Sequence, residues 1–159
     1  RRVMVIEYLI TPIGIAGGEG EGKRRVSSTV FECIKAIGTI PVVLKEAVQQ
    51  LQEYFDGERT VFTFKLNPSG TDFQKKVWDA LLEIPFGKTI SYLDLSKRLG
   101  DVKAIRAVAS ANGKNPLWIV IPCHRVIGTN GDLTGYAGGL HRKKWLLEHE
   151  SPAKQTALF

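Results

Sequence analysis

Cysteine, methionine and histidine are all scarce in this chain of 159 residues, which has 2 Cys, 1 Met and 3 His. Two cysteines allow at most one disulfide, and nothing else in the sequence suggests an oxidising compartment, so reduced thiols are expected. The histidines, His124, His141 and His149, all lie in the last quarter of the chain. Cys33 therefore has no nearby ligand partners, which argues against a Cys/His zinc site in the N-terminal half, and no metal is expected.

Long apolar runs are also missing. No run approaches the roughly 20 residues that span a bilayer, and the N-terminus shows no signal-peptide pattern. The hydrophobic content of 43% is nevertheless enough for a core. We therefore expect a soluble globular protein with no membrane partner, located in the cytoplasm, or in the nucleus of a eukaryote.

Acidic side chains are outnumbered, with 16 Asp and Glu against 22 Lys and Arg, which gives a net charge of +6. Residues 71–150 carry 12 basic and 8 acidic side chains, a net of +4, whereas residues 1–70 carry 9 and 8, a net of +1. The net positive charge therefore predicts that residues 71–150, rather than residues 1–70, would bind a polyanion such as DNA. A solvated basic face explains the same numbers equally well.

The N-terminal part is expected to form a small α/β unit without visible chemistry. Residues 4–10 and 26–34 are predicted as strands, and residues 62–66 alternate as a half-buried strand does. Residues 17–25 are glycine-rich and charged, but no Gly-Lys-Ser/Thr opens a helix there, so a solvated loop is predicted. Residues 42–55 are predicted as an amphipathic helix. Its apolar face is Leu44, Val48, Leu51 and Phe55.

The Asn-Pro-Ser-Gly segment at residues 67–70 breaks the pattern, and it divides the chain into domains at residues 1–70 and 71–159. The second domain begins with a capping box, in which the side chains of Thr71 and Gln74 each satisfy a backbone N–H at the start of a helix. The apolar face of that helix is expected to contain Phe73, Val77 and Leu81.

Two short helices are predicted next. Ser91 with Asp94 opens the first, which Gly100 closes, and Asp101 caps the second, over residues 102–112. Two short helices joined by one tight turn are typical of a helix-turn-helix. A final helix, with Leu140, Trp145 and Leu147 as its apolar residues, is predicted to end near Glu150.

The second short helix has small residues around a single arginine. Arg106, Ala109, Ser110 and Gly113 share one face, which would let the helix backbone approach a partner closely. A helix that reads bases would carry Asn, Gln or several Arg, so sequence-independent DNA contact fits better than operator recognition. An Ala-rich helix with a surface arginine is the alternative that this composition leaves open.

The most informative stretch is Ile-Pro-Cys-His-Arg-Val at residues 121–126, which places a thiol, an imidazole and a guanidinium side by side. The apolar run at residues 117–121 is predicted as a buried strand or extended segment. A thiol at its end would sit on a fixed backbone, as a positioned nucleophile requires. Taken alone, Cys123 could equally be a buried small residue, because adjacent residues of an extended chain point to opposite faces.

Together these motifs resemble the O6-alkylguanine-DNA alkyltransferases (methylated-DNA–protein-cysteine methyltransferases). The match is dense over residues 71–150, and before residue 71 only the order of elements agrees. The matching strings are Asn-Pro at 115–116, Pro-Cys-His-Arg-Val at 122–126, Gly-Tyr-Ala-Gly-Gly-Leu at 135–140 and Trp-Leu-Leu-Glu-His-Glu at 145–150. The resemblance implies an α+β fold, with a ribonuclease-H-like α/β domain followed by a mainly helical domain that contains the helix-turn-helix.

The resemblance also implies a reaction, namely DNA repair by irreversible, single-turnover transfer of an alkyl group from O6-alkylguanine, or O4-alkylthymine, to Cys123. The damaged nucleotide would be flipped out of the duplex. Glu150 would orient His124, which would activate the thiol through an ordered water. Tyr92 would donate a proton to the leaving guanine. No cofactor is implied, because DNA is itself the alkyl donor.

The remaining implied roles concern DNA binding and the guanine pocket. The helix at 102–112 would enter the minor groove of double-stranded DNA without sequence preference, and Arg106 would take the place of the extruded nucleotide. Contacts with DNA are implied for Tyr92, Arg106, Ala107, Ala109 and Ser110. The pocket is implied to contain Asn115 as a hinge, Val126, Tyr136 and Ala137, with the Cys123 and Val126 carbonyls on the exocyclic amine. A monomer is expected.

Two departures and two rival functions stay open. Ile105 is bulkier than the alanine usual beside the arginine finger, and the pocket around Asn112 and Ala137 varies in the family, which leaves the tolerated size of the alkyl group open. Arg125 fits structural bracing better than chemistry. A non-catalytic alkylation-damage-binding protein is the main rival, and the presence of Cys123 argues against it. A cysteine hydrolase using Cys123 and His124 would leave the helix-turn-helix, Arg106 and the loop at 135–140 unexplained.

Overall fold

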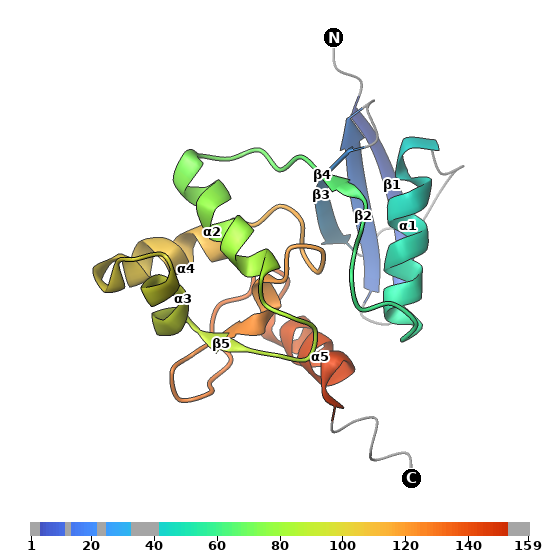
Figure 1. The fold of residues 1–159 in the computed structure, drawn as a ribbon. Coiled ribbons are helices and arrows are strands. Elements are labelled where there is room, and N and C mark those ends of the chain that lie inside the picture. The colour runs from blue at the N-terminus through green and yellow to red at the C-terminus, as the bar shows by residue number, and fades with distance from the viewer. Residues whose placement is uncertain (1–3, 12–13, 22–24, 33–41, 153–159) are drawn as a thin grey trace. The chain divides into compact units, whose positions relative to one another are not determined.

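The computed structural model describes residues 4–11, 14–21, 25–32 and 42–152, with side chains from residue 45 onward. The chain divides into two compact units, Arg1–Ser69 and Gly70–Phe159, and each is described by itself (Figure 1). Within the described ranges, no helix is both long and apolar enough to cross a membrane. Cys33, and with it the question of a disulfide or an N-terminal zinc site, lies outside the described residues.

The first unit is a four-stranded sheet with one helix. Strands β1 (Met4–Thr11), β2 (Gly14–Glu21) and β3 (Arg25–Glu32) form an antiparallel meander, and the short β4 (Lys65–Leu66) pairs parallel with β3. Helix α1 (Val42–Phe55) packs against the three antiparallel strands, as Figure 1 shows. The predicted helix is confirmed, and Leu51 and Phe55 of its predicted face are buried.

Two predictions for this unit are wrong. The loop predicted at 17–25 is in fact strand as far as Glu21, because β2 pairs with β1 on one side and β3 on the other. Ladder pairing satisfies the backbone groups of a glycine-rich stretch whatever its side chains are, and a bulge between Glu19 and Gly20 absorbs the irregularity. The strand predicted at 62–66 is reduced to Lys65–Leu66, since only these residues find a partner, on β3.

The second unit is mainly helical. Its helices are α2 (Asp72–Leu82), α3 (Tyr92–Arg98), α4 (Ile105–Gly113) and α5 (Leu140–Glu150), and a parallel pair is formed by β5 (Ile90–Ser91) and β6 (Val126–Ile127). The predicted capping box is confirmed, with Thr71 and Gln74 each accepting a hydrogen bond from the other's backbone N–H. The predicted helix at 102–112 begins instead with a 3₁₀ turn, Val102–Ala104, that Asp101 caps.

Helices α2, α3 and α4 pack together around a small core. Trp78 of α2 is 2% exposed and donates its indole N–H to the carbonyl of Ala111 in α4 at 2.9 Å. Val77 and Leu81 are buried as predicted, but Phe73 is 40% exposed, because Trp78 rather than Phe73 fills the space toward α4. Helix α4 is thus fixed to the core along one side only, which leaves Arg106 and Ser110 exposed.

Candidate active site

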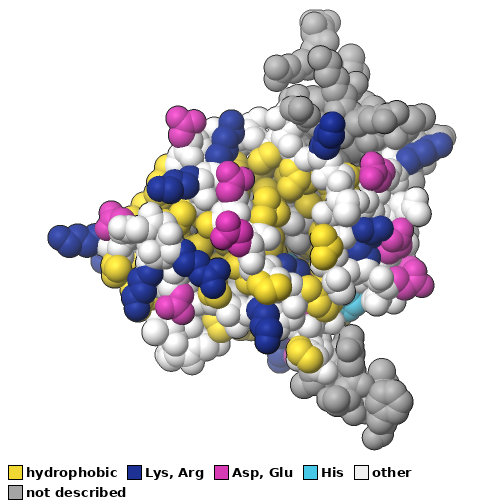
Figure 2. All heavy atoms as spheres, in the orientation of Figure 1, with side chains coloured by type: hydrophobic (Ala, Val, Ile, Leu, Met, Phe, Trp, Pro, Cys, Tyr) yellow, Lys and Arg dark blue, Asp and Glu magenta, His cyan; other side chains and the backbone are white. Residues whose placement is uncertain are grey.

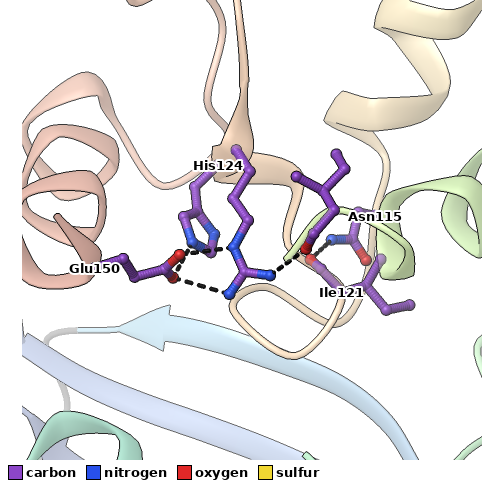
Figure 3. Close-up of polar contacts among 6 residues, drawn as sticks. Asn115, Ile121, His124 and Glu150 are labelled. Atoms are coloured by element: carbon purple, nitrogen blue, oxygen red, sulfur yellow. Dashed lines mark hydrogen bonds and ion pairs between the residues drawn. The ribbon is translucent and has the colours of Figure 1, made fainter. Parts of the chain in front are cut away.

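A strained turn leads to the cysteine, so the extended segment predicted at 117–121 is wrong. The N–H of Ile121 donates to the carbonyl of Leu117 at 2.9 Å, and Ile119 has a φ of 76°. Such a left-handed conformation costs a β-branched residue about 1–2 kcal/mol. Asn115 stabilises the turn by accepting from the Leu117 N–H at 2.9 Å and donating to the Ile121 carbonyl at 2.7 Å (Figure 3).

A short parallel pairing brings Tyr92 to the cysteine segment. Ile90 of β5 pairs with Val126 of β6. Tyr92 is the first residue of α3, directly after β5, and Cys123 lies in the 3₁₀ turn Cys123–Arg125, directly before β6. Two residues far apart in the sequence, both of which the family resemblance implicates in one reaction, therefore lie in the same part of this unit.

Cys123 is only 3% exposed, and this burial raises the pKa of its thiol to about 11. The Asn115 side chain and the positive charge of Lys143 act in the opposite direction, but burial outweighs them. The thiol is therefore protonated at neutral pH, and a nucleophilic role requires a base close by.

His124 is the candidate for this base. Its Nε2 atom lies 2.6 Å from Oε2 of Glu150, and both side chains are buried and face one another in Figure 3. Burial lowers the pKa of His124 despite the Glu150 charge, so the ring is neutral. A carboxylate can only accept, so Nε2 carries the proton and Nδ1 carries the lone pair. Among the described residues Nδ1 has no hydrogen-bond partner.

Arg125 braces the same carboxylate. Its Nε donates to Oε1 of Glu150 at 2.6 Å and its Nη2 to Oε2 at 3.2 Å, while Nη1 donates to the carbonyl of Ile84 at 2.6 Å. Burial alone would raise the pKa of Glu150, but these hydrogen bonds and the charges beside it hold that pKa well below its ordinary value. Glu150 is therefore an ionised acceptor that fixes the orientation of the imidazole.

A pocket of about 640 Å³ opens beside this group, within the size range of small-molecule sites. The residues that line it are Tyr92, Ile105, Arg106, Ala109, Gly113, Thr134, Gly135, Tyr136 and Ala137. Four of the predicted DNA-binding and pocket residues, Arg106, Ala109, Tyr136 and Ala137, thus meet Tyr92 here. Ala107 and Ser110 are exposed on α4 and are not part of the lining, and Cys123 lies buried next to it rather than on its wall.

The two tyrosines of the pocket lie close to the thiol. Burial raises the pKa of both Tyr92 and Tyr136, and negative charge on Cys123 would raise each further. The hydroxyl of Tyr92 donates to the carbonyl of Thr134 at 3.1 Å. Both phenols therefore keep their protons at neutral pH, and Tyr92 can act as a proton donor.

Lys143 is a residue of this site that the sequence analysis does not predict. Its Nζ is buried and donates to the carbonyls of Val126 at 2.6 Å and Thr134 at 2.9 Å. Burial lowers the pKa of this lysine to about 8, although the nearby Cys123 opposes the shift. One of the carbonyls expected to hold the guanine amine, that of Val126, thus already accepts a charged hydrogen bond.

The spacing of α5 could have identified Lys143. The buried residues of this helix are Lys143, Leu146 and Glu150, which recur at i, i+3 and i+7 on one face. The helix ends at Glu150 as predicted, but its apolar residues do not form the inner face, since Leu140 is 48% exposed and Trp145 and Leu147 are only half-buried. Two charged residues occupy the inner face because the carbonyls, Arg125 and His124 provide their partners.

Comparison with known proteins places this geometry in a family. Residues 72–152 match the family model described as the DNA-binding domain of 6-O-methylguanine DNA methyltransferase. A Methanosarcina acetivorans methylated-DNA–protein-cysteine methyltransferase is 56% identical over 150 residues, covering 92% of this chain and 96% of its own. The crystal structure of the Mycobacterium tuberculosis O6-methylguanine methyltransferase superimposes with a TM-score of 0.83 at 39% identity. The match covers 99% of this chain and 100% of that one.

A Mycobacterium tuberculosis OGT solved in complex with DNA gives the same TM-score of 0.83 at 40% identity, over 97% of this chain and 99% of that one. The likeness thus extends over both units, including the N-terminal one, for which the sequence motifs predict agreement only in the order of elements. With a buried histidine–glutamate pair directly after its buried cysteine, the chain belongs to the family of the methylated-DNA–protein-cysteine methyltransferases.

Proposed function

We propose that this protein repairs alkylated DNA by transferring the alkyl group from O6 of guanine, or O4 of thymine, to Sγ of its own Cys123, once per molecule. The observation that carries the proposal is the buried Cys123 followed by a neutral His124 that an ionised Glu150 holds at 2.6 Å. A protonated thiol beside a positioned neutral base is what a nucleophile activated at the moment of reaction requires.

In the proposed reaction, Nδ1 of His124 takes the thiol proton through an ordered water. Sγ of Cys123 then attacks the alkyl carbon in line, so that the S–C bond forms while the C–O6 bond breaks and its electron pair stays on guanine. Tyr92 donates a proton to the ring of the leaving base. The product is a thioether without a good leaving group, so the protein is consumed, and the reaction uses no cofactor because DNA supplies the alkyl group.

We further propose that α3 and α4 act as a helix-turn-helix whose second helix enters the minor groove without reading sequence. The small side chains of Ala107, Ala109 and Ser110 support a close approach to the backbone, and Arg106, at the rim of the pocket, supports a role in replacing the flipped nucleotide. On the face in view, Figure 2 shows Lys and Arg side chains interspersed with acidic ones rather than in one continuous patch. A moderate salt dependence is therefore expected, and we propose that the protein binds DNA as a monomer.

Two finer assignments belong to the same proposal. The antiparallel meander, helix and parallel strand of the first unit support a ribonuclease-H-like class for that unit. A DNA substrate requires that the protein work where DNA is kept, which is the cytoplasm of a prokaryote or the nucleus of a eukaryote. The rival function, non-catalytic damage binding, is not favoured, because binding alone requires neither the Cys123 thiol nor a base beside it.

Intact-mass analysis tests the transfer. Incubation with duplex DNA containing one O6-methylguanine should add one methyl group per protein molecule, and peptide mapping should place it on Cys123 and not on Cys33. The matched control is Cys123→Ala, which should stay unmodified while still binding DNA. Repeated turnover, or methylation of Cys33 alone, would overturn the proposed function.

A further inference from the structure

Asn112, in the last turn of α4, carries a buried and unpaired amide oxygen beside the cysteine. The residue is 2% exposed, and its Nδ2 donates to the carbonyl of Cys123 at 3.4 Å. Its Oδ1 is buried and has no hydrogen-bond partner among the residues that the structure describes. Buried polar side-chain atoms nearly always have a partner, so a buried acceptor left over at a binding site indicates a donor that the ligand brings.

The position of Asn112 relates this acceptor to the pocket. Ala109 and Gly113, one turn before it and directly after it on α4, both line the pocket, together with Tyr92. The Asn112 side chain also interacts with Tyr92, where its hydrogen bond partly offsets the rise of the tyrosine pKa caused by burial. The amide thus lies between the backbone of the nucleophile and the expected proton donor.

The orientation of the amide follows from its partner. The carbonyl of Cys123 can only accept, so the nitrogen of Asn112 must face it and the oxygen must be the atom that is left over. An oxygen of this kind selects for an N–H group. Alkylation at O6 removes the N1–H of guanine, and the exocyclic 2-amino group is then the only N–H donor of the base in DNA. O4-alkylthymine has no ring N–H or amino group at all.

We propose that Oδ1 of Asn112 accepts a hydrogen bond from the 2-amino group of the flipped O6-alkylguanine and thereby sets the preference for guanine over thymine lesions. The inference rests on the proposed function. It is consistent with the neighbouring acceptors, since the carbonyl of Val126 is already bonded to Lys143 and that of Cys123 to Asn112 itself. A carbonyl oxygen has a second lone pair, so the Cys123 carbonyl can accept one hydrogen of the amino group while Oδ1 of Asn112 accepts the other.

The test compares transfer rates on three duplexes that contain O6-methylguanine, O6-methylhypoxanthine or O4-methylthymine, where the second differs from the first only by lacking the 2-amino group. Asn112→Leu, similar in size but without polar atoms, should react about tenfold or more slowly with O6-methylguanine and within about threefold of wild type with the other two. Asn112→Ser has a hydroxyl that is too short to reach the 2-amino group, so this variant should also lose the preference for O6-methylguanine. It serves as the test if the Leu variant fails to fold.

Equal losses on all three substrates would mean that Asn112 only supports the fold, and that result would overturn the inference. Unchanged discrimination between O6-methylguanine and O6-methylhypoxanthine in both variants would overturn it as well. A wild-type protein that methylates Cys123 on none of the substrates would instead overturn the proposed function, so the two failures are distinguishable.

Discussion

Nε2 of His124 lies 2.6 Å from Oε2 of Glu150, and both residues are buried in the second unit. Because Arg125 holds the other side of the same carboxylate, Glu150 cannot turn away from the imidazole without losing two further hydrogen bonds. The ring is therefore fixed in the tautomer whose Nδ1 can accept a proton. The activation of Cys123 that we propose depends on this arrangement, since burial raises the pKa of the thiol to about 11.

Glu150→Gln should slow methyl transfer by about 100-fold or more, because an amide neither carries the charge nor enforces the tautomer of His124. The rate is measured by intact mass against time with O6-methylguanine duplex in excess. Glu148→Gln is the matched control, since the Glu148 side chain is 59% exposed and its ion-pair partner, Lys144, lies at 3.9 Å. A Glu150→Gln protein as fast as this control would contradict the role given to Glu150.

Acidification should destabilise the protein in two steps. The pKa of His124 is lowered in the folded state, so below about pH 6.5 the unfolded chain takes up a proton that the folded chain refuses. The pKa of Glu150 is also lowered on folding, so the same happens below about pH 4.3. In both windows the unfolded state binds more protons, and the free energy of unfolding falls as pH falls.

Thermal melts followed by circular dichroism between pH 7.5 and pH 4 measure this dependence. His124→Gln should remove the fall between pH 6.5 and pH 5 and keep the fall near pH 4. His141→Gln, at an exposed position of α5, should reproduce the wild-type curve. If the slope above pH 5 persists without His124, another group is responsible for it.

The sequence predicts well those parts of the fold that local rules determine. Thr71 with Gln74, Ser91 and Asp101 each mark a helix start correctly, because a cap depends only on residues within one turn. The glycine-rich β2 is missed, because its stability comes from two neighbouring strands that a local pattern does not contain. The prediction that Phe73 lies on the buried face is wrong for a similar reason, since Trp78 makes the contact with α4 instead.

The same distinction between local and non-local determinants applies to the candidate site. The Cys-His-Arg motif and its family resemblance lead to Glu150 and Tyr92, but no periodicity predicts a turn in which Ile119 takes a positive φ. That turn exists because the side chain of Asn115 replaces backbone partners across it. Lys143 is missed because a lysine in a basic stretch of sequence is expected to be exposed to solvent. Here the hydrogen bonds to two carbonyls make its burial favourable.

Lys143→Met should slow transfer at pH 7 by about tenfold, because it removes the positive charge that lowers the pKa of Cys123 and leaves two carbonyls without their donor. The deficit should shrink as the pH rises past about 8, where the wild-type lysine itself loses its charge. Lys144→Met is the control, since its side chain is 68% exposed. A deficit that does not change with pH would mean that Lys143 acts through packing alone.

Arg106→Ala should harm repair of duplex DNA far more than reaction with a free O6-alkylguanine base. Flipping a nucleotide costs a few kcal/mol, and an arginine that occupies the vacated place recovers part of this cost, so its loss should slow duplex repair by about 10- to 100-fold. The free base needs no flipping, and its rate should change by less than about threefold. Arg106→Lys should fall between the two, because it keeps the charge but not the planar group that stacks between bases. Equal losses on duplex and free base would place Arg106 in the guanine pocket, which it also lines, and not at the site of extrusion.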